Sequence, residues 1–191
     1  MALILASQSP RRKDLLGLLR IPFTIQSTDI DETLDTHCPI PDAVARLSLR
    51  KALAAIRDPQ DTVIAADTIV VCEGKVLGKP QDAAQAKAML RLLSGRDHQV
   101  MTGCTVLTEK DCVTFTEVTD LHFRPLTEKE IETYVASGEP MDKAGAYGIQ
   151  GGAALFCQRM NGDYYNVMGL PVCRLWETLV SLLPEEMEES L

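Results

Sequence analysis

Residues 62–72 constrain the fold of this chain more than any other stretch. They read TVIAADTIVVC, a nearly continuous apolar run that Asp67 and Thr68 interrupt. A run without polar alternation is typical of a strand that is covered on both faces, as in α/β proteins whose helices flank a sheet. We therefore expect buried strands over residues 62–66 and 69–72.

The carboxylate of Asp67 is out of place in this run. Burying an ionised carboxylate among apolar groups without a partner costs several kcal/mol, so Asp67 should be neutral, paired with a cation or bound to a metal. Its position at the end of a buried strand is also where open α/β sheets bind ligands. The alternative is a structural aspartate that caps a turn with Thr68.

Apolar periodicity and capping residues predict helices alternating with strands in the first half of the chain, and hairpins in the second half. Further strands are expected over residues 3–6, 23–27, 99–107, 113–123, 153–158 and 164–168. The last two would form a hairpin around Asn161-Gly162. Helices are expected to begin near Pro10, Pro41, Asp82, Thr127 and Pro171. This pattern predicts a mixed, twisted sheet with helices on its faces.

We expect one α/β domain over residues 1–184, in which two lobes flank a central cleft, and a disordered acidic tail over residues 185–191. No stretch approaches the roughly 20 apolar residues that span a bilayer, and we expect a cytoplasmic protein. The 191 residues carry a net charge of −8, which opposes binding to nucleic acid polymers and to membrane surfaces. An anionic ligand would have to meet a local cluster of cations.

The segment SQSPRR, residues 7–12, offers such a cluster. It places the hydroxyls of Ser7 and Ser9, the free N–H groups of a helix start, and the guanidiniums of Arg11 and Arg12 close together. Helix N-termini favour anions, and arginine forks match phosphate oxygens. The alternative is an N-cap followed by a solvated basic turn.

Two lysines and a glycine-rich loop are further candidates. Lys51 lies on the largely apolar face of its helix, so its ammonium should either snorkel to solvent or meet a buried anion. Lys79 lies in a Gly-Lys-Pro turn. The restricted backbone of this turn either holds the ammonium in place beside a ligand or belongs to an ordinary exposed turn. The loop over residues 142–152 either presents Gln150, whose amide both donates and accepts, or is simply flexible.

Several common catalytic motifs are missing from the chain. It has no P-loop, dinucleotide-binding fingerprint, hydrolase nucleophile elbow or zinc-protease motif, and its three histidines lack metal-ligand spacing. The acidic groups, lysines and arginines that remain suit a phosphate ester and a hard cation such as Mg²⁺ or Mn²⁺.

Five short motifs are similar to those of one known family. They read SQSPRR, AADTIV, GKP, LSGR and DKAGAYGIQG, and they follow the family's order and spacing over residues 3–170. By these motifs the chain resembles the Maf family of nucleoside triphosphate pyrophosphatases. The resemblance implies a fold similar to that of inosine triphosphate pyrophosphatases and a homodimer. It also implies cleavage between the α- and β-phosphates to a nucleoside monophosphate and pyrophosphate.

The resemblance further implies a role for each candidate residue. Asp67 would be the proton acceptor, near a divalent cation (Mg²⁺ or Mn²⁺) that Asp67 and Glu32 hold. The residues that would surround the phosphates are Ser7, Ser9, Arg12, Lys51 and Lys79.

Three positions resemble the Maf subgroup that acts on dTTP and UTP, and differ from the subgroup that acts on 7-methyl-GTP. They are Arg11, Thr68 and Gln150, which would set specificity. Modified pyrimidine triphosphates are a further substrate class to consider. The alternative function is a nucleotide-sensing regulator of cell division, through septum inhibition, in which binding rather than turnover matters.

Overall fold

The computed structural model describes residues 2–188 as a mixed α/β fold, as predicted. The strands are β1 (Leu3–Leu5), β2 (Thr24–Ile25), β3 (Thr62–Cys72), β4 (Lys75–Leu77), β5 (Asp97–Leu107), β6 (Cys112–Phe123) and β7 (Cys157–Asn161). The helices are α1 (Pro10–Gly17), α2 (Ile40–Ala55), α3 (Ala83–Leu93), α4 (Glu128–Ala136), α5 (Tyr164–Met168), α6 (Val172–Leu182) and α7 (Pro184–Glu188). Short 3₁₀ turns cover Glu139–Asp142, Ala144–Ala146 and Gly152–Leu155.

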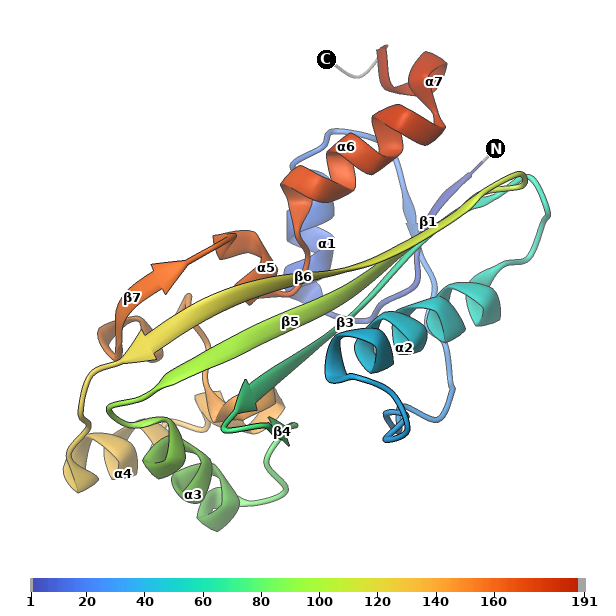
Figure 1. Cartoon of the computed structure of the whole chain (residues 1–191). Coiled ribbons are helices and arrows are strands. Elements are labelled where there is room, and N and C mark those ends of the chain that lie inside the picture. The colour runs from blue at the N-terminus through green and yellow to red at the C-terminus, as the bar shows by residue number, and fades with distance from the viewer. Residues whose placement is uncertain (1, 189–191) are drawn as a thin grey trace. The chain divides into compact units, whose positions relative to one another are not determined.

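The strands form one seven-stranded sheet, hydrogen-bonded in the order β2-β1-β3-β5-β6-β7, and β4 also pairs with β3 (Figure 1). The chain divides into two compact units. Unit 1 contains residues 2–67, 102–117 and 169–188, and unit 2 contains residues 68–101 and 118–168. Three long strands, β3, β5 and β6, contribute residues to both units.

Unit 1 holds the parallel part of the sheet. β1 pairs in parallel with both β2 and β3, so that Leu5 lies opposite Ile25 on one side and Ile64 on the other. Figure 1 shows α2 on one side of the strands of this unit and α6 on the other. Coverage on both faces explains why the first half of β3 is apolar throughout.

The helix α2 packs tightly on unit 1 because Gly103 on β5 has no side chain. A Cβ atom at Gly103 would lie 2.3 Å from the Val44 carbonyl oxygen of α2. One turn further along the same face, the buried Ser48 hydroxyl lies 2.8 Å from the Thr105 hydroxyl of β5. The next turn on this face carries Lys51, so this close packing fixes where Lys51 lies.

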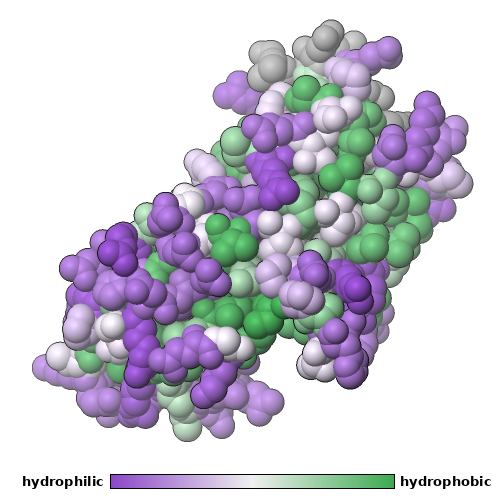
Figure 2. Space-filling view, viewed as in Figure 1, coloured by the Kyte–Doolittle hydropathy of each residue, from purple (hydrophilic) through white to green (hydrophobic). Residues whose placement is uncertain are grey.

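Unit 2 has an aromatic cluster in its core. The Phe123 ring packs edge-on against His98 and Tyr147, with ring centroids 4.7 Å and 4.8 Å away. His98 is 3% exposed, and its Nε2 lies 2.9 Å from the Tyr147 hydroxyl. Burial lowers the pKa of His98 to about 4. Hydrophilic residues cover much of the visible surface over α3 and α4, whose apolar faces point into this core (Figure 2).

The predicted hairpin over residues 153–168 is wrong. β7 pairs antiparallel with β6, whereas α5 is a helix. Asp163 Oδ1 accepts a hydrogen bond from the Tyr165 N–H at 2.7 Å, and the buried Asn166 side chain donates to the Val100 carbonyl at 3.1 Å. The Asp163 side chain caps the turn after β7, and the chain continues there into α5 rather than into a returning strand.

Residues 185–188 form part of α7 instead of the predicted disordered tail. The Met187 N–H donates to the Leu183 carbonyl at 3.1 Å, and Met187 is 3% exposed. The apolar Met187 side chain gives this acidic segment a surface to bury. The rest of the predicted tail, residues 189–191, lies outside the described residues. No helix within residues 2–188 combines the length and the apolar character that crossing a membrane requires.

Candidate functional site

The ammonium of Lys51 joins two carboxylates in unit 1. Its Nζ lies 2.5 Å from Asp67 Oδ1 and 2.8 Å from Glu32 Oε1. The side chains of Lys51 and Asp67 are 8% and 15% exposed, whereas that of Glu32 is 60% exposed. Of the two predictions for Lys51, contact with an anion is therefore the correct one. Asp67 is paired, and β3 runs through it without the turn that the alternative requires.

Three elements bring these side chains together. Lys51 lies on the buried face of α2, Asp67 lies on β3, and Glu32 lies in the segment between β2 and α2. The α2 residue Arg50 donates from Nη2 to the Thr33 carbonyl at 2.7 Å, next to Glu32. The helix that carries Lys51 thus also holds the loop that carries Glu32.

The loop between β1 and α1 is built around two serines. Ser9 caps α1, and its Oγ accepts from the Arg12 N–H at 3.5 Å, as predicted. Ser7 Oγ accepts from the Ser9 N–H at 3.2 Å and from Arg12 Nη1 at 3.3 Å. Arg11 is partly buried in the first turn of α1. Ser7, Ser9 and Arg12 are thus hydrogen-bonded together at the N-terminus of α1.

Arg12 is anchored by a residue that the sequence reasoning missed. Its Nε donates to the Gly169 carbonyl at 2.7 Å. Gly169 has a φ of 115°, a conformation that favours glycine. In the sequence, Gly169 stands just before Leu170 and Pro171, where a helix is expected to begin. That placement could have indicated a turn with a positive φ.

The Arg12 guanidinium lies in partly desolvated surroundings. Burial lowers the pKa of the Arg12 guanidinium, and the negative charges of Asp67 and Glu32 act in the opposite direction. An arginine side chain stays protonated in proteins, so this site keeps a partly desolvated cation. A phosphate group would offset that desolvation through charge-assisted hydrogen bonds.

The other three predicted residues lie in unit 2. Thr68 is partly buried on β3, Lys79 is exposed in the loop after β4, and Gln150 is exposed in the glycine-rich loop. The Gly145 N–H donates to the Gly78 carbonyl at 3.0 Å, so the loops of Lys79 and Gln150 are hydrogen-bonded to each other. The structure gathers the predicted residues into two groups, one in each unit.

Asp67 and Glu32 are the residues that fit a divalent cation. Mg²⁺ is usually held by one or two carboxylates together with phosphate oxygens and waters. These two carboxylates already converge on one positive charge, the Lys51 ammonium. Residues 2–188 contain no group of three or more His, Cys, Asp or Glu side chains that could hold a metal unaided. The remaining positions around a metal held by Asp67 and Glu32 would be filled by ligand oxygens and waters.

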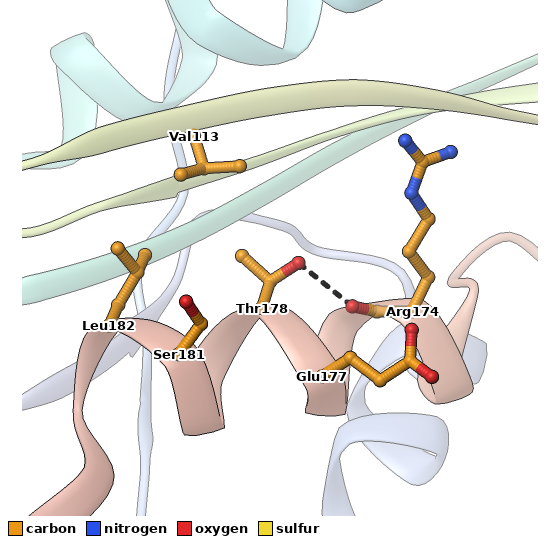
Figure 3. Close-up of a pocket in the computed structure, with 6 residues that line it drawn as sticks. All are labelled: Val113, Arg174, Glu177, Thr178, Ser181 and Leu182. Carbon is orange, nitrogen blue, oxygen red and sulfur yellow. Dashed lines mark hydrogen bonds between the residues drawn. The ribbon is translucent and has the colours of Figure 1, made fainter.

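An open pocket of about 270 Å³ in unit 1 contains none of the predicted site residues. Val113 of β6 and residues of α6 line it, and Figure 3 shows Thr178 donating its hydroxyl hydrogen to the Arg174 carbonyl. Arg174 is also engaged, because its guanidinium stacks 4.3 Å from the Phe115 ring and donates to the Thr116 carbonyl. The cluster around Lys51 is the better candidate for chemistry.

Comparison with known proteins gives consistent matches. Residues 2–182 match the Maf family, described as Maf-like protein. A dTTP/UTP pyrophosphatase of Bacillus cytotoxicus is 49% identical over 173 residues, which are 90% of this chain and 91% of the relative. A dTTP/UTP pyrophosphatase of Bacillus cereus (strain B4264) is 50% identical over 174 residues, 91% of each chain. The structure of a HAM1 protein from Coxiella burnetii is similar, with a TM-score of 0.51 at 16% identity, over 95% of this chain and 100% of that chain.

The fold is a mixed α/β sheet in which Ser7, Ser9 and Arg12 are hydrogen-bonded together at the N-terminus of the first helix. Because the family match spans nearly the whole chain and relatives are about half identical to it, the chain belongs to the Maf family. The resemblance drawn from the five motifs is therefore confirmed. The likeness to the HAM1 protein concerns the fold alone.

Proposed function

We propose that this chain is a nucleoside triphosphate pyrophosphatase that hydrolyses dTTP and UTP to the nucleoside monophosphate and pyrophosphate. The observation that carries the proposal is the Lys51 ammonium held between Asp67 and Glu32. The activity named for both relatives, at about half identity over nine-tenths of the chain, supports the same substrates.

The triphosphate would be bound by hydroxyl, amide and cationic donors. Arg12 and the N–H groups at the start of α1 offer charge-assisted hydrogen bonds, and Ser7 and Ser9 shape this loop. Lys51 and Lys79 would supply point charges that stabilise negative charge on the leaving pyrophosphate.

Asp67 would act as the proton acceptor for the attacking water. Its carboxylate is 15% exposed, and Lys51 fixes the position of one oxygen. Asp67 and Glu32 would hold a Mg²⁺ or Mn²⁺ ion together with phosphate oxygens. When bound, such an ion neutralises charge on the phosphates as a Lewis acid. The protein's own part is to hold the carboxylates, the cations and the substrate in one fixed geometry.

Arg11, Thr68 and Gln150 would select the nucleobase. The Gln150 amide is exposed at a turn and can pair with a base edge as both donor and acceptor. The proposal extends to modified pyrimidine triphosphates as a further substrate class.

The proposed enzyme acts as a homodimer in the cytoplasm, where its substrates are found. Light scattering of the purified protein tests the dimer, and a monomeric mass would contradict it. A regulator of cell division that binds nucleotides without turnover is not favoured, because both relatives at about half identity are named as pyrophosphatases.

The test is a panel of dTTP, UTP, CTP, ATP, GTP and 7-methyl-GTP with Mg²⁺ or Mn²⁺, in which pyrophosphate and monophosphate are measured. We expect dTTP and UTP to show the highest kcat/KM, with equal amounts of the two products. Release of inorganic phosphate instead of pyrophosphate would overturn the proposed cleavage position. Binding of dTTP without any product would favour the regulator.

A further inference from the structure

Gln150 stands at the corner of a tight turn in unit 2. The Gly151 N–H donates to the Gly148 carbonyl at 3.0 Å, which closes a β-turn over residues 148–151. Tyr147 and Ile149 are 5% and 9% exposed, whereas Gln150 is exposed. The turn is therefore anchored by two buried neighbours and presents one polar side chain.

Tyr134 of α4 and Glu139 of the following 3₁₀ turn hold this turn at two points. The Gly148 N–H donates to the Tyr134 hydroxyl oxygen at 3.0 Å, and the Gly152 N–H donates to Glu139 Oε2 at 3.0 Å. The Tyr134 hydroxyl in turn donates to Glu139 Oε1 at 2.8 Å. One hydrogen-bonded pair thus holds the main chain two residues before and two residues after Gln150.

The Glu139 carboxylate also packs directly on the turn. A Cβ atom at Gly151 would lie 2.1 Å from Glu139 Oε1, so this position needs a glycine for the carboxylate to reach its partners. Tyr134 is 6% exposed, and burial raises the pKa of its hydroxyl, which therefore remains a neutral donor. Neither Tyr134 nor Glu139 was singled out by the sequence reasoning.

We propose that Tyr134 and Glu139 are positioning residues that fix the orientation of Gln150 and thereby set the affinity for the nucleobase. The inference rests on the proposed function, in which Gln150 contacts the base. It assigns base selection to a rigid, hydrogen-bonded turn rather than to a loop that orders only when the nucleotide binds.

The test is a double-mutant cycle that combines Tyr134→Phe with Gln150→Ala. The dissociation constant for the α,β-methylene analogue of UTP is measured by calorimetry for the wild type, both single variants and the double variant. Removing the hydroxyl leaves the Gly148 N–H without its acceptor, so we expect about tenfold weaker binding in the wild-type background. In the Gln150→Ala background, Tyr134→Phe should change binding less than twofold, on the order of the usual error of additivity.

Effects of Tyr134→Phe that are equally large in both backgrounds would overturn the inference, because they would show a role independent of Gln150. Glu139→Gln is a second variant, expected to give the same coupling if Tyr134→Phe fails to fold. Tyr164→Phe, which alters an exposed tyrosine of the same unit, is the matched control and should bind like the wild type.

Pyrophosphate release by the wild type separates this inference from the proposed function. Coupled binding without hydrolysis would overturn the proposed activity and support the positioning role. Hydrolysis with independent effects would overturn the positioning role alone, and a wild type that neither binds the analogue nor releases pyrophosphate would overturn both.

Discussion

The Lys51 ammonium of α2 lies 2.5 Å from the Asp67 carboxylate of β3, and both side chains are largely buried. Each charge would be costly to bury alone, and the pair offsets part of that cost. Glu32, on the more exposed side, is a second carboxylate partner of Lys51.

Lys51→Met tests the role of the central cation. The variant keeps the apolar stem but leaves Asp67 with an uncompensated charge, so we expect a loss of about 2 kcal/mol in the free energy of unfolding. Pyrophosphate release should fall by on the order of 100-fold, because a charge that stabilises the leaving group is lost. Chemical denaturation and steady-state kinetics measure the two effects. Arg57→Met, which removes an exposed cation just after α2, is the control. It should change neither the free energy of unfolding nor the rate of pyrophosphate release.

Gly103→Ala tests the packing that positions Lys51. The added Cβ atom would lie 2.3 Å from the Val44 carbonyl oxygen, so α2 has to move away from β5. We expect a destabilisation of about 1–3 kcal/mol together with reduced kcat. Gly17→Ala, where an added Cβ atom meets nothing within 4 Å, is the control. Wild-type stability for Gly103→Ala would contradict the packing described here.

His98→Gln tests the buried histidine through its pH dependence. Burial lowers the pKa of His98 from 6.5 to about 4, so the folded protein favours its neutral form. The contribution of neutral His98 to the free energy of unfolding is fully present above pH 6.5 and is lost as the pH falls toward about 4. This contribution is at most about 3 kcal/mol. Thermal unfolding across this range should show a smaller acid-induced loss for His98→Gln than for the wild type. His37→Gln, at an exposed position, is the control and should lose as much stability on acidification as the wild type.

Gln150→Glu tests base selection. The substitution keeps the size of the side chain but removes its amide donor, so we expect the ratio of kcat/KM for UTP to that for 7-methyl-GTP to fall by about tenfold. Gln158→Glu, an exposed position on β7, should leave the ratio unchanged. An unchanged ratio in Gln150→Glu would remove Gln150 from specificity.

The sequence predicted the candidate site better than it predicted the second half of the fold. Asp67 within an apolar run and Lys51 on an apolar helix face were each anomalous, and the structure pairs them. Charge in a buried segment is a strong signal because few physical solutions satisfy it. What the sequence could not give was which anion Lys51 meets, since that depends on how α2 crosses β3.

The errors arose where local signals had more than one solution. Asn161-Gly162 is typical of a hairpin turn, yet β7 pairs with β6, and the segment after the turn becomes α5. Gly169 accepts the Arg12 hydrogen bond through its main-chain carbonyl. Every residue has such a carbonyl, so the amino-acid sequence does not reveal this contact. The supporting pair Tyr134 and Glu139 was missed for a similar reason, because its partners are glycine N–H groups.

Asp67→Asn tests the role of Asp67 as the proton acceptor for the attacking water. The asparagine keeps the shape of the side chain but cannot accept the proton from water, and Lys51 retains Glu32 as a partner. The account predicts that pyrophosphate release from dTTP falls by on the order of a thousandfold while the circular dichroism spectrum is unchanged. The exposed-site variant Asp29→Asn should keep full activity. Turnover by Asp67→Asn near the wild-type rate would contradict the account.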